Sequence, residues 1–107
     1  MSNYIFTEQA EADLANIVDY TLENWGTLKA HKYIDGLEEL AQMLADNPDI
    51  GIKREKLFNG LLCFPYESHM LYYFKQANRV AVIRVLHQNM EPENQFSDDI
   101  ERDLNVT

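Results

Sequence analysis

The sequence predicts an α+β domain in which an antiparallel helix hairpin packs on a mostly antiparallel sheet. Two long segments in the first half of the chain repeat apolar residues at the spacing of an α-helix. Three short apolar segments in the second half suit strands, and they follow one another closely enough to pair antiparallel. A chain of 107 residues has the size of one domain, so we expect residues 1–107 to share one core.

The first half of the chain predicts a short strand followed by two helices. The apolar run at residues 4–6 predicts the strand, and Thr7 follows it as a helix N-cap. Gly26 is expected to end the first helix, and Thr27 is expected to begin the second as its N-cap. The second helix stops at residues 47–48, Asn-Pro. The link is so short that the helices must fold back on each other. The two apolar stripes comprise Ala10, Leu14, Ile17, Val18, Leu22 and Trp25, and then Ala30, Tyr33, Ile34, Leu37, Leu40, Ala41 and Leu44.

Three strands are predicted in the second half of the chain. Residues 57–64 suit a strand that is interrupted near Gly60 by a turn or bulge, and Pro65 is expected to close it. Residues 68–74 and 79–90 are two further apolar segments, and the short polar stretch between them is expected to form a hairpin turn. With the N-terminal elements, the predicted order is strand, helix, helix, strand, strand, strand.

Charge is distributed unevenly along a chain whose formal net charge is −9. Residues 51–90 hold six basic against two acidic side chains, whereas the remainder holds three basic against sixteen acidic. This acidity argues against nonspecific binding to DNA or RNA. Direct sequence-specific binding of nucleic acid is not expected either. The sheet region can still present a basic face to an acidic partner, the alternative being scattered, solvated charge. Within the acidic remainder, Phe96, Ile100 and Leu104 recur every four residues and predict a short C-terminal helix.

Several classes of protein are excluded by what the sequence lacks. The single cysteine, Cys63, cannot form an internal disulfide, and no charged-then-apolar leader opens the chain, so we expect a cytoplasmic protein. No apolar run approaches the ~20 residues that a membrane helix needs. His31, His69 and His87 show no ligand spacing with Cys63, so no metal site is expected. Phosphate-loop and nucleotide motifs are absent, and no cofactor is expected.

Two polar side chains stand in the third apolar segment of the second half. Strand alternation places Arg84 and His87 on opposite faces of the sheet. If the face of Arg84 packs on the helices, its guanidinium needs a carboxylate or carbonyl partner; if that face is open, Arg84 can anchor a partner protein, which is the alternative we favour. His87, like His69, is expected to be a structural residue that hydrogen-bonds neighbouring groups. The two predicted faces are Val80, Val82, Arg84 and Leu86, and Ala81, Ile83, Val85 and His87.

Two further features have competing interpretations. Trp25 ends the first apolar stripe beside the hairpin turn, and we expect it in the core, the alternative being an exposed recognition tip. Lys53, Arg54 and Lys56 lie just before the sheet. Such charges usually form a solvated loop, but they could instead meet an acidic partner.

A series of short motifs stands in order along about residues 3–92: Phe6-Thr7 with Ala10 and Asp13-Leu14, Trp25-Gly26, residues 45–51, residues 57–61, Ser68-His69 with Tyr72-Tyr73, and residues 83–87. In this order and spacing, the motifs resemble the ParE branch of the RelE/ParE toxin superfamily. The resemblance implies a bacterial toxin of a type II toxin-antitoxin pair, which is not an enzyme and stalls DNA gyrase with cleaved DNA. It also implies a ParD-like antitoxin that wraps the toxin in a hetero-oligomer. From this resemblance we expect antitoxin contacts at Arg84, Tyr72 and Arg79, and the candidates for target contacts are Lys53, Arg54, Lys56 and Trp25.

The rival within the superfamily is a RelE-like, ribosome-dependent mRNA endonuclease. Such an enzyme must activate the 2′-hydroxyl, stabilise phosphate charge and protonate the leaving oxygen. If this chain were a nuclease, His87 and Arg84 would carry that chemistry. The pattern departs from the nucleases, however, because His87 precedes Gln88 rather than tyrosine, and His69 precedes Met70 rather than arginine.

A third alternative follows from one departure from the ParE pattern. ParE sequences commonly place an arginine after the Gly-Leu pair of the second strand, whereas this chain has Leu62 there. The chain could therefore be a nontoxic module that keeps its antitoxin but has lost or changed its target.

Overall fold

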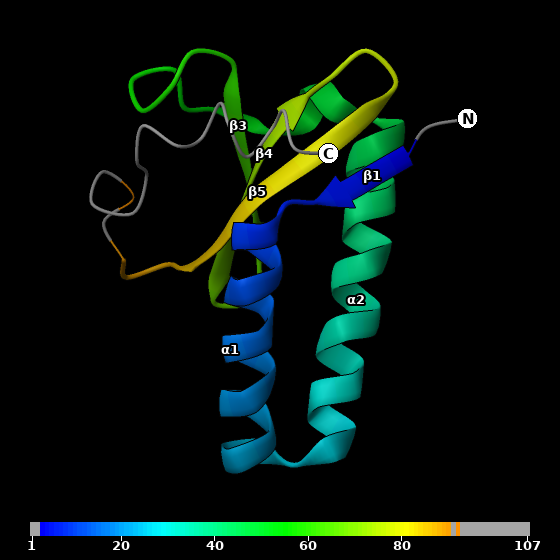
Figure 1. The fold of residues 1–107 in the computed structure, drawn as a ribbon, viewed down its shortest axis with the longest axis vertical. Coiled ribbons are helices and arrows are strands. Elements are labelled where there is room, and N and C mark those ends of the chain that lie inside the picture. The colour runs from blue at the N-terminus through cyan, green and yellow to red at the C-terminus, as the bar shows by residue number, and fades with distance from the viewer. Residues whose placement is uncertain (1–2, 91, 93–107) are drawn as a thin grey trace.

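A five-stranded sheet carries two long helices on one of its faces (Figure 1). The structure is a computed structural model and describes residues 3–90 and 92. Its elements are β1 (Asn3–Phe6), α1 (Glu8–Trp25), α2 (Thr27–Asp46), the 3-10 helix η1 (Pro48–Ile50), β2 (Ile52–Lys53), β3 (Leu61–Tyr66), β4 (His69–Lys75) and β5 (Arg79–His87). The strand order is β1-β5-β4-β3-β2, with β1 parallel to β5 and every other pair antiparallel. The α+β fold predicted from the sequence is confirmed.

A single buried threonine joins the start of α1 to the centre of the sheet. The Thr7 side chain accepts a hydrogen bond from the amide of Ala10, as expected of an N-cap, and donates one to the carbonyl of Ile83. The Thr7 amide donates to the carbonyl of Val82 at 3.0 Å. At the other end of α1, Gly26 adopts a φ of 89°, which suits glycine, and it caps both helices. Thr27 is thus the first residue of α2 rather than its N-cap.

The segment between α2 and β4 differs from the prediction. The expected strand at residues 57–64 starts only at Leu61, because residues 54–60 form a loop closed by a 2.8 Å hydrogen bond from the Arg54 amide to the Leu61 carbonyl. Pro65 lies inside β3 instead of closing it. The proline is tolerated there because β2 pairs only with Leu62 and Cys63, so that edge of β3 is already free at Pro65. The short elements η1 and β2 were not predicted.

A β-bulge in β5 changes which side chains share a face. Tyr73 pairs with Val82 and Tyr72 pairs with Arg84, so Ile83 is the extra residue. From Arg84 onward, the side chains of β5 alternate between the two faces of the sheet as predicted. Before the bulge, each side chain lies on the face opposite to the one predicted relative to Arg84. As a result, Arg84 shares a face with Leu86, as expected, but not with Val80 and Val82.

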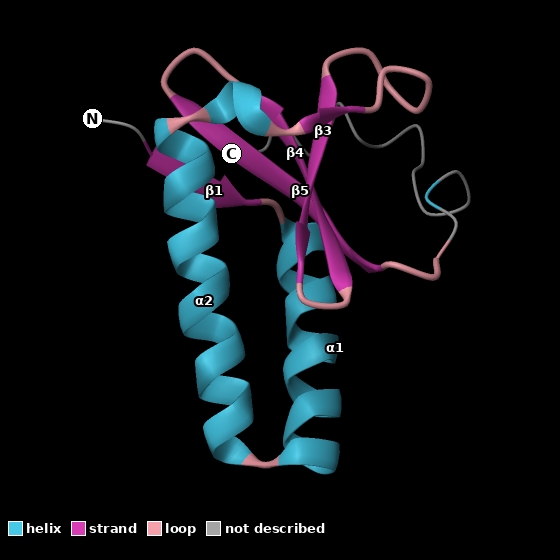
Figure 2. Ribbon diagram, turned by 180° about the vertical axis from the view of Figure 1, so that it is seen from behind, coloured by secondary structure: helices cyan, strands magenta, loops and turns pink. Residues whose placement is uncertain are grey.

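The two faces of the sheet build two separate apolar clusters. The helix-side cluster consists of Ala10, Leu37, Leu44, Leu62, Leu71, Tyr73, Val80, Val82 and Val85. The open-face cluster, on the face away from the helices, consists of Leu61, Cys63, Tyr72, Phe74, Ile83 and Leu86. Figure 2 shows both helices against the same side of the sheet.

Two further predictions concern a C-terminal helix and membrane-spanning helices. The predicted C-terminal helix at residues 96–104 lies outside the described residues. Within the described part of the chain, neither long helix has the apolar stretch needed to cross a bilayer.

Candidate functional site

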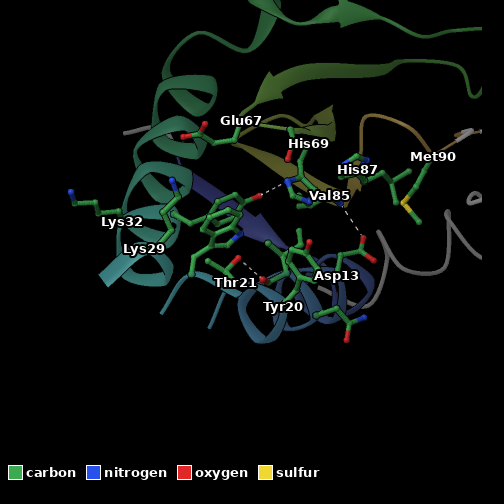
Figure 3. A pocket seen from close by; sticks show the side chains of 16 residues that line it. Asp13, Tyr20, Thr21, Lys29, Lys32, Glu67, His69, Val85, His87 and Met90 are labelled. Atoms are coloured by element: carbon green, nitrogen blue, oxygen red, sulfur yellow. Dashed lines mark hydrogen bonds between the residues drawn. The ribbon is translucent and has the colours of Figure 1, made fainter. Parts of the chain in front are cut away.

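A groove of about 750 Å³ runs between α1, the start of α2 and the ends of β4 and β5. Figure 3 shows its lining, with Tyr20 and Thr21 contributed by α1, Lys29 and Lys32 by α2, and His69 and His87 by the strands. The helix hairpin is longer than the strands that it covers, because an 18-residue helix extends about 27 Å. The last turns of the hairpin therefore have no sheet beneath them, and the groove opens there.

The hairpin tip presents large apolar side chains to solvent. Trp25 is 67% exposed and Leu28 is 72% exposed, and Tyr20 is also exposed. The ammonium group of Lys29 lies 5.9 Å from the centre of the Trp25 ring. The expectation that Trp25 belongs to the core is therefore wrong, because the apolar stripe of α1 continues past the end of the sheet. The alternative interpretation, an exposed tip, describes the structure.

Two histidines and a tyrosine form the inner wall of the groove. His69 and His87 are cross-strand partners, and their ring centres are 5.5 Å apart. The Tyr33 hydroxyl lies 3.2 Å from Nδ1 of His69. Burial and the neighbouring His87 lower the pKa of His69, while burial raises the pKa of Tyr33. At neutral pH, the Tyr33 hydroxyl and the His69 ring are therefore both uncharged, and they share one hydrogen bond.

His87 also has a backbone partner. Its Nδ1 accepts a hydrogen bond from the amide of Asn89 at 3.1 Å. This is the type of neighbouring backbone contact predicted for a histidine at the end of a strand. Across the described residues, no group of three or more histidine, cysteine, aspartate or glutamate side chains could hold a metal ion.

Arg84 and Asp13 close the edge of β5 where β1 ends. The last pair between β1 and β5 is Phe6 with Val82, so none of the described strands lies beside the edge of β5 beyond that pair. Asp13 occupies this position: its carboxylate accepts hydrogen bonds from Nε and Nη2 of Arg84 at 2.7 and 2.9 Å, and from the amide of Val85 at 3.0 Å. The two side chains are only 16% and 14% exposed. Arg84 thus stands on the open face, and it also has the carboxylate partner that was expected only for a face packed on the helices.

The residues predicted to bind an antitoxin are only partly brought together. Arg84 lies opposite Tyr72 in the sheet. Arg79 is at the start of β5, where its Nε donates to the side chain of Gln76 at 2.6 Å. Arg84 and Tyr72 therefore lie together on the sheet, whereas Arg79 lies apart from them at the start of β5.

The four candidates for target binding do not form a single surface. Lys53 and Lys56 are exposed at the β2 edge and in the loop that follows it. Arg54 is half-buried there, beside the thiol of Cys63, whose pKa is raised by burial. Trp25 stands at the tip of the helix hairpin, at the opposite end of the molecule (Figure 1).

The possible nuclease pair is also separated. His87 lines the groove, whereas Arg84 does not. The guanidinium of Arg84 is engaged with Asp13 at the edge of the sheet. Sequence reasoning missed the groove itself, to which Tyr20, Lys29 and Lys32 contribute. The available signal was the spacing of Lys29 and Lys32, three residues apart on one face of α2. The groove itself could not be predicted, because it forms only when the hairpin packs on the sheet.

Comparison with known proteins identifies the family. The family model described as "ParE toxin of type II toxin-antitoxin system, parDE" matches residues 4–92. The chain is 36% identical over 90 residues to Toxin ParE1 of Caulobacter vibrioides, covering 84% of this chain and 93% of that one. It is 32% identical over 99 residues to Toxin ParE of Escherichia coli, covering 92% and 96%. Toxin ParE1 of Mycobacterium tuberculosis is 33% identical over 91 residues, with 84% and 93% covered.

A solved structure shares the fold. The chromosomal ParDE TA system from P. aeruginosa contains a chain that superposes with a TM-score of 0.69 at 21% identity, over 81% of this chain and 96% of that chain. This similarity supports the fold, while the sequence matches establish the relationship and confirm the predicted resemblance. The protein therefore belongs to the ParE toxin family of type II toxin-antitoxin systems.

Proposed function

We propose that this protein inhibits DNA gyrase by binding it and stalling it with cleaved DNA, and that a ParD-like antitoxin neutralises it. The protein would act in the cytoplasm, and it would form a hetero-oligomer with the antitoxin. Membership of the ParE toxin family supports a toxin role. The related P. aeruginosa structure is that of a chromosomal ParDE system, which supports an antitoxin as partner.

The observation that carries a binding role is the exposed hairpin tip next to the groove. Trp25 and Leu28 are among the largest exposed apolar side chains, and Lys29 and Lys32 stand beside them. A clustered apolar surface with a charged rim is typical of a protein-binding site. Tryptophan and tyrosine are also the side chains that most often dominate binding energy at interfaces. The tip and the groove are therefore the surface that we assign to target binding.

The arrangement of polar groups favours binding over catalysis. RNA cleavage would need a general base, a general acid and a cation directed at one phosphate. Here the Arg84 guanidinium is directed at Asp13, and His69 is directed at Tyr33. His87 lies in the groove, where its Nδ1 accepts a hydrogen bond from the Asn89 amide. These contacts support a non-enzymatic role.

The antitoxin contacts that we propose lie along β5. Arg79 and Arg84 are five residues apart, so about 17 Å of strand separates them. An extended acidic segment lying along the open face could reach both, and it would cross Tyr72, the partner of Arg84, on the way. Arg84 would provide a charged contact that is already oriented by Asp13.

One observation favours the nontoxic module as a second candidate. Leu62 occupies the position where ParE sequences commonly have arginine, and it is 8% exposed within the helix-side cluster. An apolar side chain that packs toward the helices cannot replace the charge of an arginine at a target surface. If that arginine is essential for gyrase binding, this protein would bind its antitoxin without being toxic.

The test is DNA supercoiling by purified gyrase with and without this protein, scored for both topoisomers and cleaved DNA. Inhibition with accumulated cleaved DNA would support the proposed function. No effect from a folded sample that still binds a ParD-like antitoxin would favour the nontoxic module. Cleavage of mRNA on ribosomes, abolished by His87→Ala in a folded variant, would instead establish the nuclease.

A matched pair of variants would link gyrase inhibition to the hairpin tip. Trp25→Ala removes the exposed ring, and Glu23→Ala changes an exposed neighbour on the same helix. Loss of inhibition with the first variant alone would place the contact at the tip. Equal inhibition by both variants would exclude Trp25 from it.

A further inference from the structure

The tip of the helix hairpin, residues 19–32, combines the features that a self-complementary surface requires. Large apolar side chains project from it, and a groove opens beside them. In a two-fold dimer both copies contribute the same surface, so that surface must hold both the projecting side chains and the cavity that receives them. We propose that two copies of this protein associate through their hairpin tips.

Apolar exposure is concentrated at the tip. Every residue from 22 to 29 is exposed. Within the part of the chain that the structure describes, half of the large exposed apolar side chains belong to the tip. A cluster of this kind marks an interaction surface, whereas single exposed apolar side chains are ordinary. The four side chains are Tyr20, Leu22, Trp25 and Leu28, which are 63%, 42%, 67% and 72% exposed.

The groove can receive an aromatic side chain. Its volume is about 750 Å³, and Ile17, Tyr20 and Val85 give it apolar walls. Trp25 stands at the rim of the groove, so the indole ring of one copy can enter the groove of the other. Two-fold symmetry then requires the same contact in reverse. Burial of such a ring is among the most favourable contacts that an interface can make.

The charges of the tip are also self-complementary. Asp19 and Glu23 are exposed four residues apart on one face of α1, and Lys29 and Lys32 are exposed three residues apart on one face of α2. The salt bridges found among the described residues lie elsewhere, so these four charges are available to a partner. A two-fold arrangement that places α1 of one copy against α2 of the other pairs both sets at once.

The net charge of the chain does not prevent this contact. Residues 19–32 contain two acidic and two basic side chains, so the formal charge of −9 resides outside the tip. At physiological salt, exposed charges that are more than about 8 Å apart are largely screened from each other. The tip is therefore the region where two copies can approach with the least repulsion.

The size of the surface suits a reversible dimer. A standard interface takes about 20 to 30 residues from each partner. Sixteen residues line the groove, and Leu22, Glu23 and Leu28 extend the same surface beyond it. Because this total lies at the lower limit, we expect a dissociation constant on the order of 10 µM.

Self-association would regulate the surface that we assign to target binding. Trp25 and the groove would be buried in the dimer, so only the monomer could bind gyrase. Accumulation of the protein would then store it in an inactive form. This consequence rests on the proposed function, whereas the dimer itself does not.

The experiment is sedimentation velocity of the full chain from about 1 to about 200 µM, a range that brackets the expected dissociation constant. Glu23→Lys and Lys32→Glu each place like charges across the interface and should raise the dissociation constant by about tenfold. An equimolar mixture of the two variants should restore the dimer, because each introduced charge then meets its opposite. Trp25→Ala should raise the dissociation constant by at least about tenfold, since it removes the projecting ring.

Glu38→Lys is the matched control. Glu38 is an exposed side chain of α2 outside the tip, and its reversal changes the net charge by the same amount as Glu23→Lys. Total charge alone predicts tighter association for both variants, because both make the chain less acidic. Weaker association in Glu23→Lys, with no weakening in Glu38→Lys, therefore reports a local contact. Circular dichroism must show a folded domain for each variant.

Three results would overturn the proposal. The first is a wild-type protein that remains monomeric at every concentration. The second is a dimer that Trp25→Ala does not weaken, which would place the interface elsewhere. The third is a pair of charge reversals that act no differently from Glu38→Lys or that do not associate when mixed. No gyrase or antitoxin is present in the assay, so its failure is separate from failure of the proposed function.

Discussion

The base of the helix hairpin is hydrogen-bonded to the sheet, whereas its tip extends past the sheet and is largely exposed to solvent. At the base, Thr7 and Asp13 connect α1 to β5 through side-chain and backbone hydrogen bonds. At the tip, Trp25 and Leu28 are mostly exposed. One end of the hairpin therefore contributes to the stability of the fold, and the other end exposes apolar side chains that can bind a partner. Substitutions at the two ends should act on different measurable properties.

The largest effect is expected at the base, from Asp13→Ala. This change leaves the partly buried guanidinium of Arg84 and the amide of Val85 without their carboxylate acceptor. Loss of one partner from such a pair costs about 3 kcal/mol of the free energy of unfolding, measured by urea denaturation. Asp19→Ala, at an exposed position of the same helix, is the control and should change little. Similar stabilities of the two variants would show that the hydrogen bonds of Asp13 to β5 do not stabilise the base of the hairpin.

The role of the pair can be sharpened with a double substitution. Replacing both Asp13 and Arg84 by apolar residues, as Asp13→Leu with Arg84→Met, removes the unpaired charge that Asp13→Ala leaves behind. The double variant should therefore be more stable than Asp13→Ala. A double variant that is less stable than the single one would show that the guanidinium has other essential contacts.

The second effect, about 2 kcal/mol, is expected where α2 meets the sheet through η1. A Cβ atom at Gly51 would overlap the Tyr73 hydroxyl and lie 2.8 Å from its Cζ atom. Tyr73 is fully buried and donates to the carbonyl of Pro48 at 2.9 Å, so it has no room to move. Gly51→Ala should therefore destabilise the protein by overpacking, measured by thermal unfolding. In a Tyr73→Phe background, which lacks the hydroxyl, the same change should cost less; an equal cost would contradict the proposed overlap.

The third effect concerns the tip and should appear in binding rather than in stability. Trp25→Ala removes a ring whose described contact is with Lys29, so the free energy of unfolding should change by less than about 0.5 kcal/mol. If the tip is the target surface, binding to gyrase should weaken by about 2 kcal/mol, measured by titration of supercoiling inhibition. Glu23→Ala is the control. A large loss of stability in Trp25→Ala would contradict the distinction between base and tip.

The sequence predicted the fold where local signals suffice and failed where tertiary packing decides. Thr7 and Gly26 mark helix ends through capping chemistry that is local, and both were placed correctly as the ends of α1. Trp25 has the spacing of a core residue, but no pattern within the helix reveals that the sheet ends before the helix does. The bulge at Ile83 is invisible for the same reason, because it depends on the register with Tyr72 and Tyr73. The carboxylate for Arg84 was anticipated as a need, but its source in Asp13, 71 residues away in sequence, was not.

The smallest effect is expected between the base and the tip, at His69. Burial and the nearby His87 lower the pKa of His69 below its value in the unfolded chain, so the unfolded state binds more protons as the pH falls through about 6.5. The contribution of His69 to stability is therefore present above that pH and is lost below it, down to the lowered pKa. In protonated His69 both ring nitrogens are donors, so the Tyr33 hydroxyl could then only accept the hydrogen bond from Nδ1.

Unfolding at pH 7.5 and pH 5.5 should thus show a larger loss of stability for the wild-type protein than for His69→Gln. His31→Gln, which removes an exposed histidine from α2, should retain the wild-type dependence. Equal pH dependence in His69→Gln and the wild type would show that His69 titrates alike in the folded and unfolded states. In that case, the inner wall of the groove would be as accessible to water as the tip. The part of the hairpin that is packed on the sheet would then end closer to the base.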